Sequence, residues 1–276
     1  MSRKMERNFI SITFGRRFAK TVTAVTESSV GECQLLPVPL NKEACMNHRV
    51  VSHDEWLAAR TEFLAREKEF TRSRDELSRQ RRELPWERVE KEYLLEGPNG
   101  KESLADLFEG RSQLIVYHFM FAPAWDAGCP HCSFWADNFN DVIVHLNHCD
   151  ITMVAVSRAP YAKLAAYRKR MGWSFKWLSS ADSDFNFDYQ ASFTDKEVAE
   201  KKAFYNFTTQ NPGGSEREGT SVFYRDDDGN VFHTYSTYAR GIDMTNTTYH
   251  YIDLVPKGRN EGDHPQHWVR RHDEYK

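Results

Sequence analysis

Residues 113–121, QLIVYHFMF, form a nearly unbroken apolar run that ends shortly before two cysteines, Cys129 and Cys132. A strand with apolar side chains on both faces belongs in the middle of a sheet that is covered on both sides. Pro130, directly after the first cysteine, is typical of the first turn of a helix, where its missing N–H costs nothing. Apolar residues spaced at about 3.6 over 130–146 predict that helix. The stretch therefore predicts a central strand followed by a helix that begins at a thiol pair.

The segments that follow complete a mixed sheet. Residues 151–156 predict a second buried strand, 160–172 a helix, 175–178 a short strand, and 221–238 a hairpin with Asp228-Gly229 at its turn. A helix is expected near 195–204 and another helix or ordered loop over 243–254. Two parallel strands need a right-handed crossover, and the helix over 130–146 supplies it. We therefore expect an α/β domain over 87–256, with a mixed sheet flanked by helices.

A long helix is predicted over residues 47–86, ahead of this domain. Ser52 and Glu55 form a capping box at its start, and Pro85 closes it. Large apolar residues recur every seven positions, at Trp56, Phe63, Phe70, Leu77 and Leu84. An apolar stripe on a long helix must be covered. We expect it to pack on its own domain, and pairing with a second copy of the chain is the alternative.

The two ends of the chain differ from the middle. Residues 1–46 are interpreted as a disordered extension or a misread start, because 1–26 are basic without the apolar region of a secretory signal and Met46 begins a plausible start. Residues 257–276 form a polar tail, which we expect to be mobile.

Charge and cysteine usage exclude several classes of protein. The net charge of −3 does not favour a nucleic-acid partner, and no apolar run approaches the length of about 18 residues that a membrane span needs. The five cysteines are irregularly spaced and odd in number, so they do not form a secreted disulfide framework. A close pair with scattered single cysteines suits a reducing compartment, and we expect a cytoplasmic protein.

The thiol pair has the placement of a redox site. A thiolate at a helix N-terminus is stabilised by free backbone N–H groups, so its pKa falls. Cys132 lies one turn further on, close enough to attack a mixed disulfide at Cys129, and His131 adds positive charge when protonated. Structural zinc needs four ligands, and no second Cys-x-x-Cys appears. A metal site that combines both cysteines with a distant residue, such as His233, remains an alternative.

The chain resembles a bacterial family of thioredoxin-like proteins of uncharacterised function, whose members are commonly labelled predicted dithiol-disulfide oxidoreductases. The resemblance runs over about residues 48–260, and the matching stretches are YHFMFAPAWDAGCPHCSFWADNF, YRKRMGWSFKWLSS, SDFNFDY and GTSVFYRDDDGNVFHTYSTYARG. The segment Gly100–Leu107 resembles the start of peroxiredoxin-like relatives. The resemblance implies a thioredoxin-like fold, with Cys129 as the nucleophile and Cys132 as the resolving thiol.

Two features depart from thioredoxin itself and lean toward the peroxiredoxin-like branch. The place of its cis-proline is taken by Gly219-Thr220-Ser221, and the tryptophan before its first cysteine lies four residues earlier here, as Trp125. The peroxidase signature Pro-x-x-x-Thr-x-x-Cys is absent. The docking of a protein substrate across the disulfide is therefore in doubt.

Several further residues are predicted to support the thiols. These are Pro130, His131, Trp125 and Thr220, together with Arg158, which follows the strand over 151–156 and suits an acidic group such as a glutathione carboxylate or a structural ion pair. His118, within the central strand, is expected to be a core residue.

We expect a dithiol-disulfide oxidoreductase without a bound cofactor or metal. Its reducing partner would be glutathione or a thioredoxin, and its substrate a disulfide or small molecule. Two alternatives remain: a copper- or zinc-binding protein that uses the same cysteines, and a non-enzymatic thioredoxin-fold interaction module.

Overall fold

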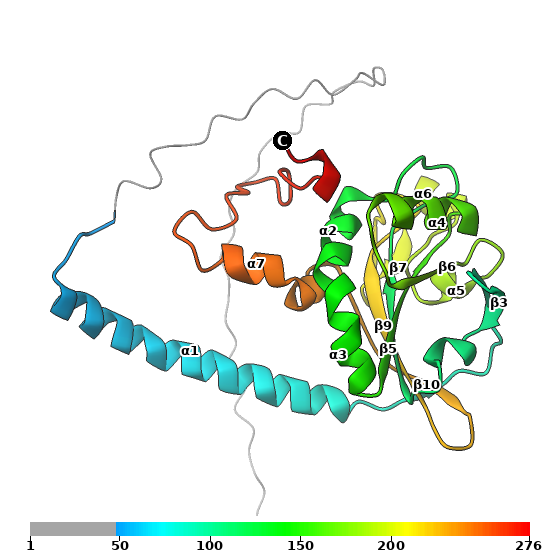
Figure 1. Ribbon diagram of the computed structural model, residues 1–276, viewed down its shortest axis with the longest axis horizontal. Coiled ribbons are helices and arrows are strands. Elements are labelled where there is room, and N and C mark those ends of the chain that lie inside the picture. Colours follow the sequence, from blue (N-terminus) through cyan, green and yellow to red (C-terminus); the bar gives the residue numbers. More distant parts are fainter. Residues whose placement is uncertain (1–47) are drawn as a thin grey trace, which may run out of the picture. The chain divides into compact units, whose positions relative to one another are not determined.

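The computed structural model describes residues 48–276, so the expectations for residues 1–46 lie outside the described part (Figure 1). The elements, in chain order, are α1 (His53–Arg82), β1 (Glu87–Arg88), β2 (Leu94–Gly97), β3 (Gly100–Ser103), β4 (Gln113–His118), α2 (Pro130–Phe139), α3 (Ile143–His148), β5 (Ile151–Ser157), α4 (Tyr161–Arg170), β6 (Lys176–Ser179), α5 (Phe185–Asp188), α6 (Asp195–Ala199), β7 (Ala203–Tyr205), β8 (Thr208–Gln210), β9 (Gly219–Arg225), β10 (Val231–Tyr238) and α7 (Thr247–Ile252). Short 3₁₀ turns stand at Asp106–Phe108, Asn140–Val142, Ala239–Thr245 and His272–Glu274.

In the described residues, eight strands form one mixed sheet in the order β1-β10-β9-β4-β5-β6-β2-β3. β4 runs parallel to β5 and antiparallel to β9, and β5 runs parallel to β6. The inner order β10-β9-β4-β5, with a helical crossover between β4 and β5, is that of the thioredoxin fold. The predicted mixed α/β fold with a long N-terminal helix is thus confirmed, because the buried runs and the crossover length leave few other topologies.

The core lies on both faces of the sheet. Alternate residues of β4 face opposite sides, so Tyr117 joins the cluster that holds both cysteines of the pair, whereas Val116 joins the cluster around Phe185. His118 is fully buried and hydrogen-bonded to Ser221 (2.9 Å), as expected for a core histidine. In Figure 1, α2 and α3 stand beside the sheet, against its central strands.

The helix α1 begins as predicted and has an uncovered apolar stripe. Ser52 and Glu55 form the expected capping box, but no residue of α1 is buried, and Phe70 is 70% exposed. We expected this stripe to pack on its own domain, and that expectation is not met. One large apolar residue per two turns makes a face much narrower than the roughly 100° stripe of a helix that docks on a core. Pairing with a second copy stays a prediction.

Two predicted helices are shorter in the structure. The helix expected over 130–146 is interrupted by a 3₁₀ turn that begins at Asn140. The Asn140 side chain accepts a hydrogen bond from the Ser174 N–H at 2.8 Å. The helix expected near 195–204 ends at Ala199, because Lys201 adopts a left-handed backbone and the chain then forms β7. Both ends depend on contacts and backbone angles that apolar spacing does not encode.

The C-terminal tail is packed, in contrast to the expected mobile segment. Val269 is buried and Trp268 packs beside it in the cluster that contains the two cysteines. Arg170 of α4 forms ion pairs with Asp273 and Glu274, at 2.8 and 3.0 Å. The packing of Trp268 and Val269, together with these ion pairs, holds the polar segment against the domain.

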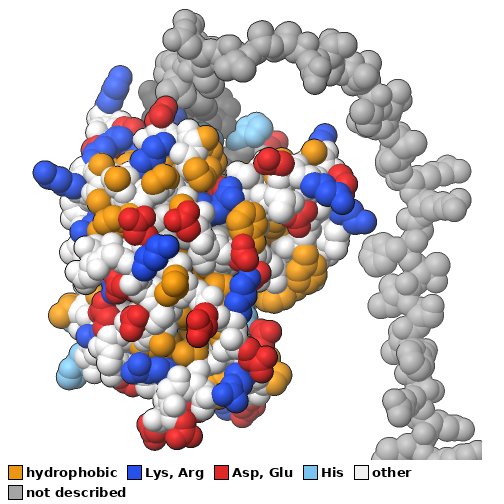
Figure 2. Space-filling model, turned by 90° about the vertical axis from the view of Figure 1, so that its right-hand side faces the viewer, with side chains coloured by type: hydrophobic (Ala, Val, Ile, Leu, Met, Phe, Trp, Pro, Cys, Tyr) orange, Lys and Arg blue, Asp and Glu red, His pale blue; other side chains and the backbone are white. Residues whose placement is uncertain are grey.

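The face drawn in Figure 2 has no large patch of a single charge, because acidic and basic side chains are mixed with apolar ones. Among the described residues, no helix is both long enough and apolar enough to cross a membrane.

Candidate active site

The loop after β4 delivers Cys129 to the start of α2. The Cys129 N–H donates to the Met120 carbonyl at 3.1 Å, and its own carbonyl accepts the Ser133 N–H at 2.9 Å and the Ser133 hydroxyl at 2.8 Å. Pro130 occupies the first turn, as predicted from the sequence. Cys129 is therefore the residue that caps α2, with its side chain at the positive end of the helix.

Cys132 lies one turn into α2 and is almost completely buried. Its sulfur accepts the Met120 N–H at 3.4 Å, and only 2% of the residue is exposed, against 9% for Cys129. Both thiols are free. The structure thus brings the two predicted thiols together, with only the first of them near solvent.

The two thiols titrate in opposite directions. A hydrogen bond from the Cys132 thiol, and then His131, hold the pKa of Cys129 well below its usual value, against the effect of burial. The His131 Nδ1 lies 4.0 Å from the Cys129 sulfur, and this contact raises the pKa of His131. Burial raises the pKa of Cys132, and the charge of Cys129 adds to the effect. The site therefore favours a thiolate at Cys129 and a protonated thiol at Cys132.

A cavity of about 230 Å³ opens over the pair. Its walls come from five separate parts of the described chain: β4 and its loop, the start of α2, the residues before β9, the 3₁₀ turn after β10, and the tail. Tyr117 lines it with a buried hydroxyl that has no hydrogen-bond partner among the described residues. Such a hydroxyl is costly unless something else bonds to it.

Glu218 is a cavity residue that sequence reasoning missed. It lies directly before β9 and lines the same cavity as the two cysteines, and it forms no ion pair within the described chain. Burial raises the pKa of its carboxyl, and the negative charge of Cys129 raises it further. The sequence comparison with thioredoxin pointed to 219–221, one residue too late, so Glu218 was passed over.

The other predicted supporting residues lie around the site and not in it. Thr220 is buried within β9, opposite Tyr117 of β4, and does not line the cavity. Trp125 packs on the core from the loop, and its carbonyl accepts a hydrogen bond from Lys163 at 3.0 Å. Strand pairing accounts for the position of Thr220, and packing on the core accounts for that of Trp125.

Arg158 forms a structural ion pair. Its guanidinium lies 2.7 Å from the buried carboxylate of Glu216 and over the ring of Phe187, and it does not line the cavity. Of the two roles that the sequence left open for Arg158, the geometry matches the ion pair. The guanidinium groups that do line the cavity are those of Arg217 and Arg240, and sequence reasoning assigned neither to the site.

The ligand set of the metal alternative is not brought together. His233 bonds to Ser236 at 2.7 Å and lies 3.3 Å from Glu87, at the outer edge of the sheet, and it does not line the cavity. Within residues 48–276, no three His, Cys, Asp or Glu side chains are grouped as metal ligands.

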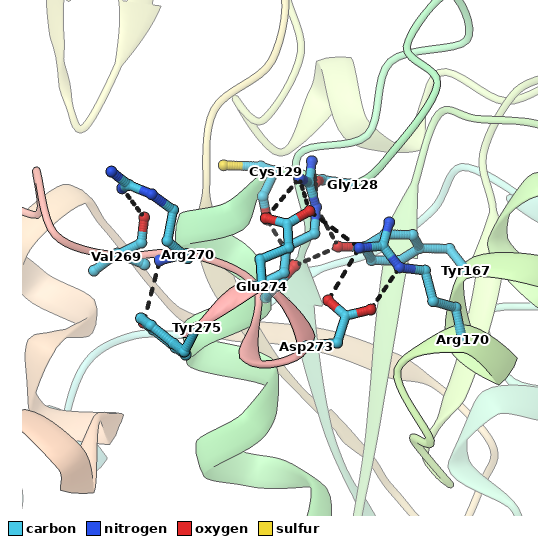
Figure 3. Close-up of polar contacts among 11 residues, drawn as sticks. Gly128, Cys129, Tyr167, Arg170, Val269, Arg270, Asp273, Glu274 and Tyr275 are labelled. Atoms are coloured by element: carbon cyan, nitrogen blue, oxygen red, sulfur yellow. Dashed lines mark hydrogen bonds and ion pairs between the residues drawn. The ribbon is translucent and has the colours of Figure 1, made fainter. Parts of the chain in front are cut away.

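The tail braces the peptide in front of Cys129 (Figure 3). Arg271 donates to the Gly128 carbonyl at 3.2 and 2.9 Å and to the Tyr167 hydroxyl at 2.8 Å. That hydroxyl lies 2.9 Å from Ser133, in the first turn of α2. One guanidinium thus connects the loop, α4 and α2 around Cys129.

Replacing Gly128 by alanine should destabilise the domain and displace Cys129. A Cβ there would lie 2.8 Å from the Phe119 ring and 2.9 Å from the Tyr167 ring, and both rings are buried in the core, so a side chain at this position forces them to shift. We expect a loss of roughly 1–3 kcal/mol in the free energy of unfolding, measured by denaturant titration. Gly214→Ala is the matched control, because no atom lies within 4 Å of its Cβ position. Equal stability of the two variants would contradict the close packing around Gly128.

Comparisons with known proteins give one family and a set of distant structures. A family described as "Bacterial protein of unknown function (DUF899)" matches residues 45–275. A search of curated proteins found no match. Peroxiredoxin Q of Xanthomonas campestris is 12% identical, over 56% of this chain and 86% of that one, with a TM-score of 0.40. Peroxidoxin BcpB of Mycobacterium tuberculosis is 17% identical, over 61% and 97%, also with a TM-score of 0.40.

Proposed function

We propose that this chain, which belongs to the DUF899 family of bacterial proteins of unknown function, is a dithiol-disulfide oxidoreductase. One observation carries the proposal: Cys129 caps α2 with its sulfur 4.0 Å from the His131 Nδ1, and a second free thiol, Cys132, lies one turn away in the same buried cluster. Thiol-disulfide exchange needs this pairing of an attacking thiolate with a resolving thiol in reach.

The proposed reaction has two exchange steps. The Cys129 thiolate attacks one sulfur of a disulfide, which forms a mixed disulfide and releases the other half as a thiolate. Cys132 then loses its proton, attacks the Cys129 sulfur and releases the second half, which takes up the proton. Two electrons pass from the chain to the substrate, and a disulfide joins Cys129 to Cys132. A thiol partner, such as glutathione or a thioredoxin, reverses the oxidation of the chain.

Burial and charge support Cys129 as the attacking thiol and Cys132 as the resolving one. Both line the cavity, but the pKa of Cys129 is lowered, whereas burial and the charge of Cys129 raise the pKa of Cys132. Once Cys129 is in a mixed disulfide, its negative charge no longer raises the pKa of Cys132, and only burial, the larger cause, still does. The Cys132 thiolate therefore forms more readily after the attacking step than before it.

Cys132→Ser should trap the intermediate. The serine cannot resolve the mixed disulfide, so a pre-reduced variant mixed with a small disulfide should keep one adduct on Cys129, whereas the unaltered chain should keep none and gain an internal disulfide. Peptide mass spectrometry identifies the modified cysteine. The same experiment with Cys149→Ser, at an exposed thiol, should behave like the unaltered chain. An adduct confined to Cys149 would exclude Cys129 as the nucleophile.

A further inference from the structure

The Cys129 thiol lines a small cavity and is almost completely buried. Cys129 is 9% exposed, and Gln266 of the tail, together with Arg240 and Asp243 of the turn after β10, stands in the wall of the cavity. In thiol-disulfide exchange, the Cys129 sulfur must approach the attacked sulfur along the axis of the substrate's S–S bond. A disulfide held within a folded protein cannot place its sulfurs in a volume of about 230 Å³ without displacing this wall.

The backbone beside the cavity is already paired. The Phe193 N–H donates to the Ser215 carbonyl, and the Arg217 N–H to the Ala191 carbonyl, each at 2.9 Å. Ser192 and Glu216 form an antiparallel bridge between these two bonds. An extended peptide that enters the site would need such backbone groups to pair with. Because the chain's own 191–193 segment occupies them, this edge offers no place for a substrate strand.

Two donors in the cavity wall are only partly satisfied by the protein itself. The Arg217 Nε donates to the Pro212 carbonyl, but the guanidinium forms no ion pair among the described residues. Arg240, also in the wall, is paired with Asp243 at 3.1 Å. The Tyr117 hydroxyl is buried without a hydrogen-bond partner among the described residues. A guanidinium without an ion pair and a phenol without a partner are donors suited to a carboxylate.

From this arrangement, and on the basis of the proposed function, we propose that the substrate is a low-molecular-weight disulfide that bears a carboxylate, which Arg217 binds. The carboxylate contacts Arg217 while the disulfide lies over Cys129. The role that the sequence suggested for Arg158 therefore belongs to Arg217, 59 positions later in the chain but at the cavity wall. The exchange itself proceeds as written above, with two small thiols as products and the chain disulfide as the oxidised product.

The test compares three disulfides with the pre-reduced full chain: dithiodipropionate, which carries carboxylates, hydroxyethyl disulfide, which is neutral and of similar size, and insulin. We expect Arg217→Met to raise KM for dithiodipropionate by about tenfold, equivalent to ~1.4 kcal/mol, with little change in kcat. KM for hydroxyethyl disulfide should not change, and insulin should react slowest. Arg225→Met, on β9 but outside the cavity, is the matched control and should resemble the unaltered chain.

Binding separates this inference from the proposed function. Dithiodipropionate should bind to Cys129→Ser, which cannot react, and binding should weaken about tenfold when Arg217→Met is added; calorimetry measures both. Equal binding with and without Arg217→Met, or insulin reduced as fast as dithiodipropionate, would overturn the inference and leave the exchange chemistry intact. Binding to Cys129→Ser without any turnover by the unaltered chain would instead overturn the proposed function.

Discussion

Cys129→Ser should abolish disulfide reduction, with a fall in kcat/KM of at least about a thousandfold, because the reaction loses its nucleophile outright. A serine hydroxyl at this position has a pKa far above that of the thiol, and the helix N-terminus and His131 cannot compensate for the difference. The remaining Cys132 is 2% exposed and has a raised pKa, so it cannot take over the attack. Turnover of a small disulfide, followed by release of its thiols, measures the effect.

Cys149→Ser provides the matched control for this loss. The substitution is identical in chemistry, but Cys149 is exposed, directly after α3, and outside the cavity. Its rate should equal that of the unaltered chain. If Cys129→Ser kept more than about a tenth of the activity, the nucleophile would lie elsewhere and the assignment of the site would be wrong.

His131→Ala should raise the pKa of Cys129 and lower the reduction potential of the pair. The imidazole stabilises the thiolate, which exists only in the reduced form, so its loss weakens the reduced form relative to the disulfide. His131 is exposed and screened by solvent, so we expect a shift of no more than about one pKa unit, or ~30 mV. The pH dependence of iodoacetamide alkylation reports the pKa, and equilibration with glutathione buffers reports the potential.

The lowered pKa of Cys129 also makes the stability of the reduced chain depend on pH. In the reduced chain, the pKa of Cys129 is lower in the folded state than in the unfolded state. The stability that this thiolate adds is present above the unfolded pKa of about 8.5 and is lost as pH falls through the folded pKa. His131→Ala should raise the folded-state pKa of Cys129 and so narrow the pH range between the folded-state and unfolded-state pKa. His148→Ala, on α3 away from the cavity, should leave this range unchanged.

The potential of the unaltered chain tests the combined stabilisation of the Cys129 thiolate by Cys132 and His131. We expect a value well above that of thioredoxin, which lies at about −270 mV. A glutathione titration that places it at or below about −270 mV would contradict a stabilised thiolate, and with it the role of His131.

The thiol pair and the elements that position it follow from the sequence, because they depend on residues close together in the chain. The apolar run of β4, Pro130 and the spacing of the two cysteines predict the strand, the helix start and the thiol pair before any tertiary contact is known. The capping box at Ser52 and the crossover between β4 and β5 follow in the same way. Each is a local pattern with a known period or a known turn chemistry.

The walls of the cavity do not follow from any local pattern. Arg217 and Glu218 precede β9 by one or two residues in a polar stretch without periodicity, and their position depends on the pairing of β9 with β4. Gln266 and Arg271 come from a tail whose composition predicts mobility, and two packed residues, Trp268 and Val269, hold it in place. Helix α1 shows the opposite error, since its apolar spacing predicts a covered face that the described chain leaves exposed.

The sequence by itself thus determined the fold class, the thiol pair and the helix that lowers the pKa of Cys129. These depend on hydrogen bonds and side chains within a few residues of one another. Only the tertiary structure decided what surrounds the Cys129 thiol: an Arg217 without an ion pair among the described residues, a buried Tyr117 hydroxyl, and a tail that holds Gly128 in place. Those groups meet through contacts across more than 80 positions of the chain, where no spacing in the sequence records which side chains will face each other.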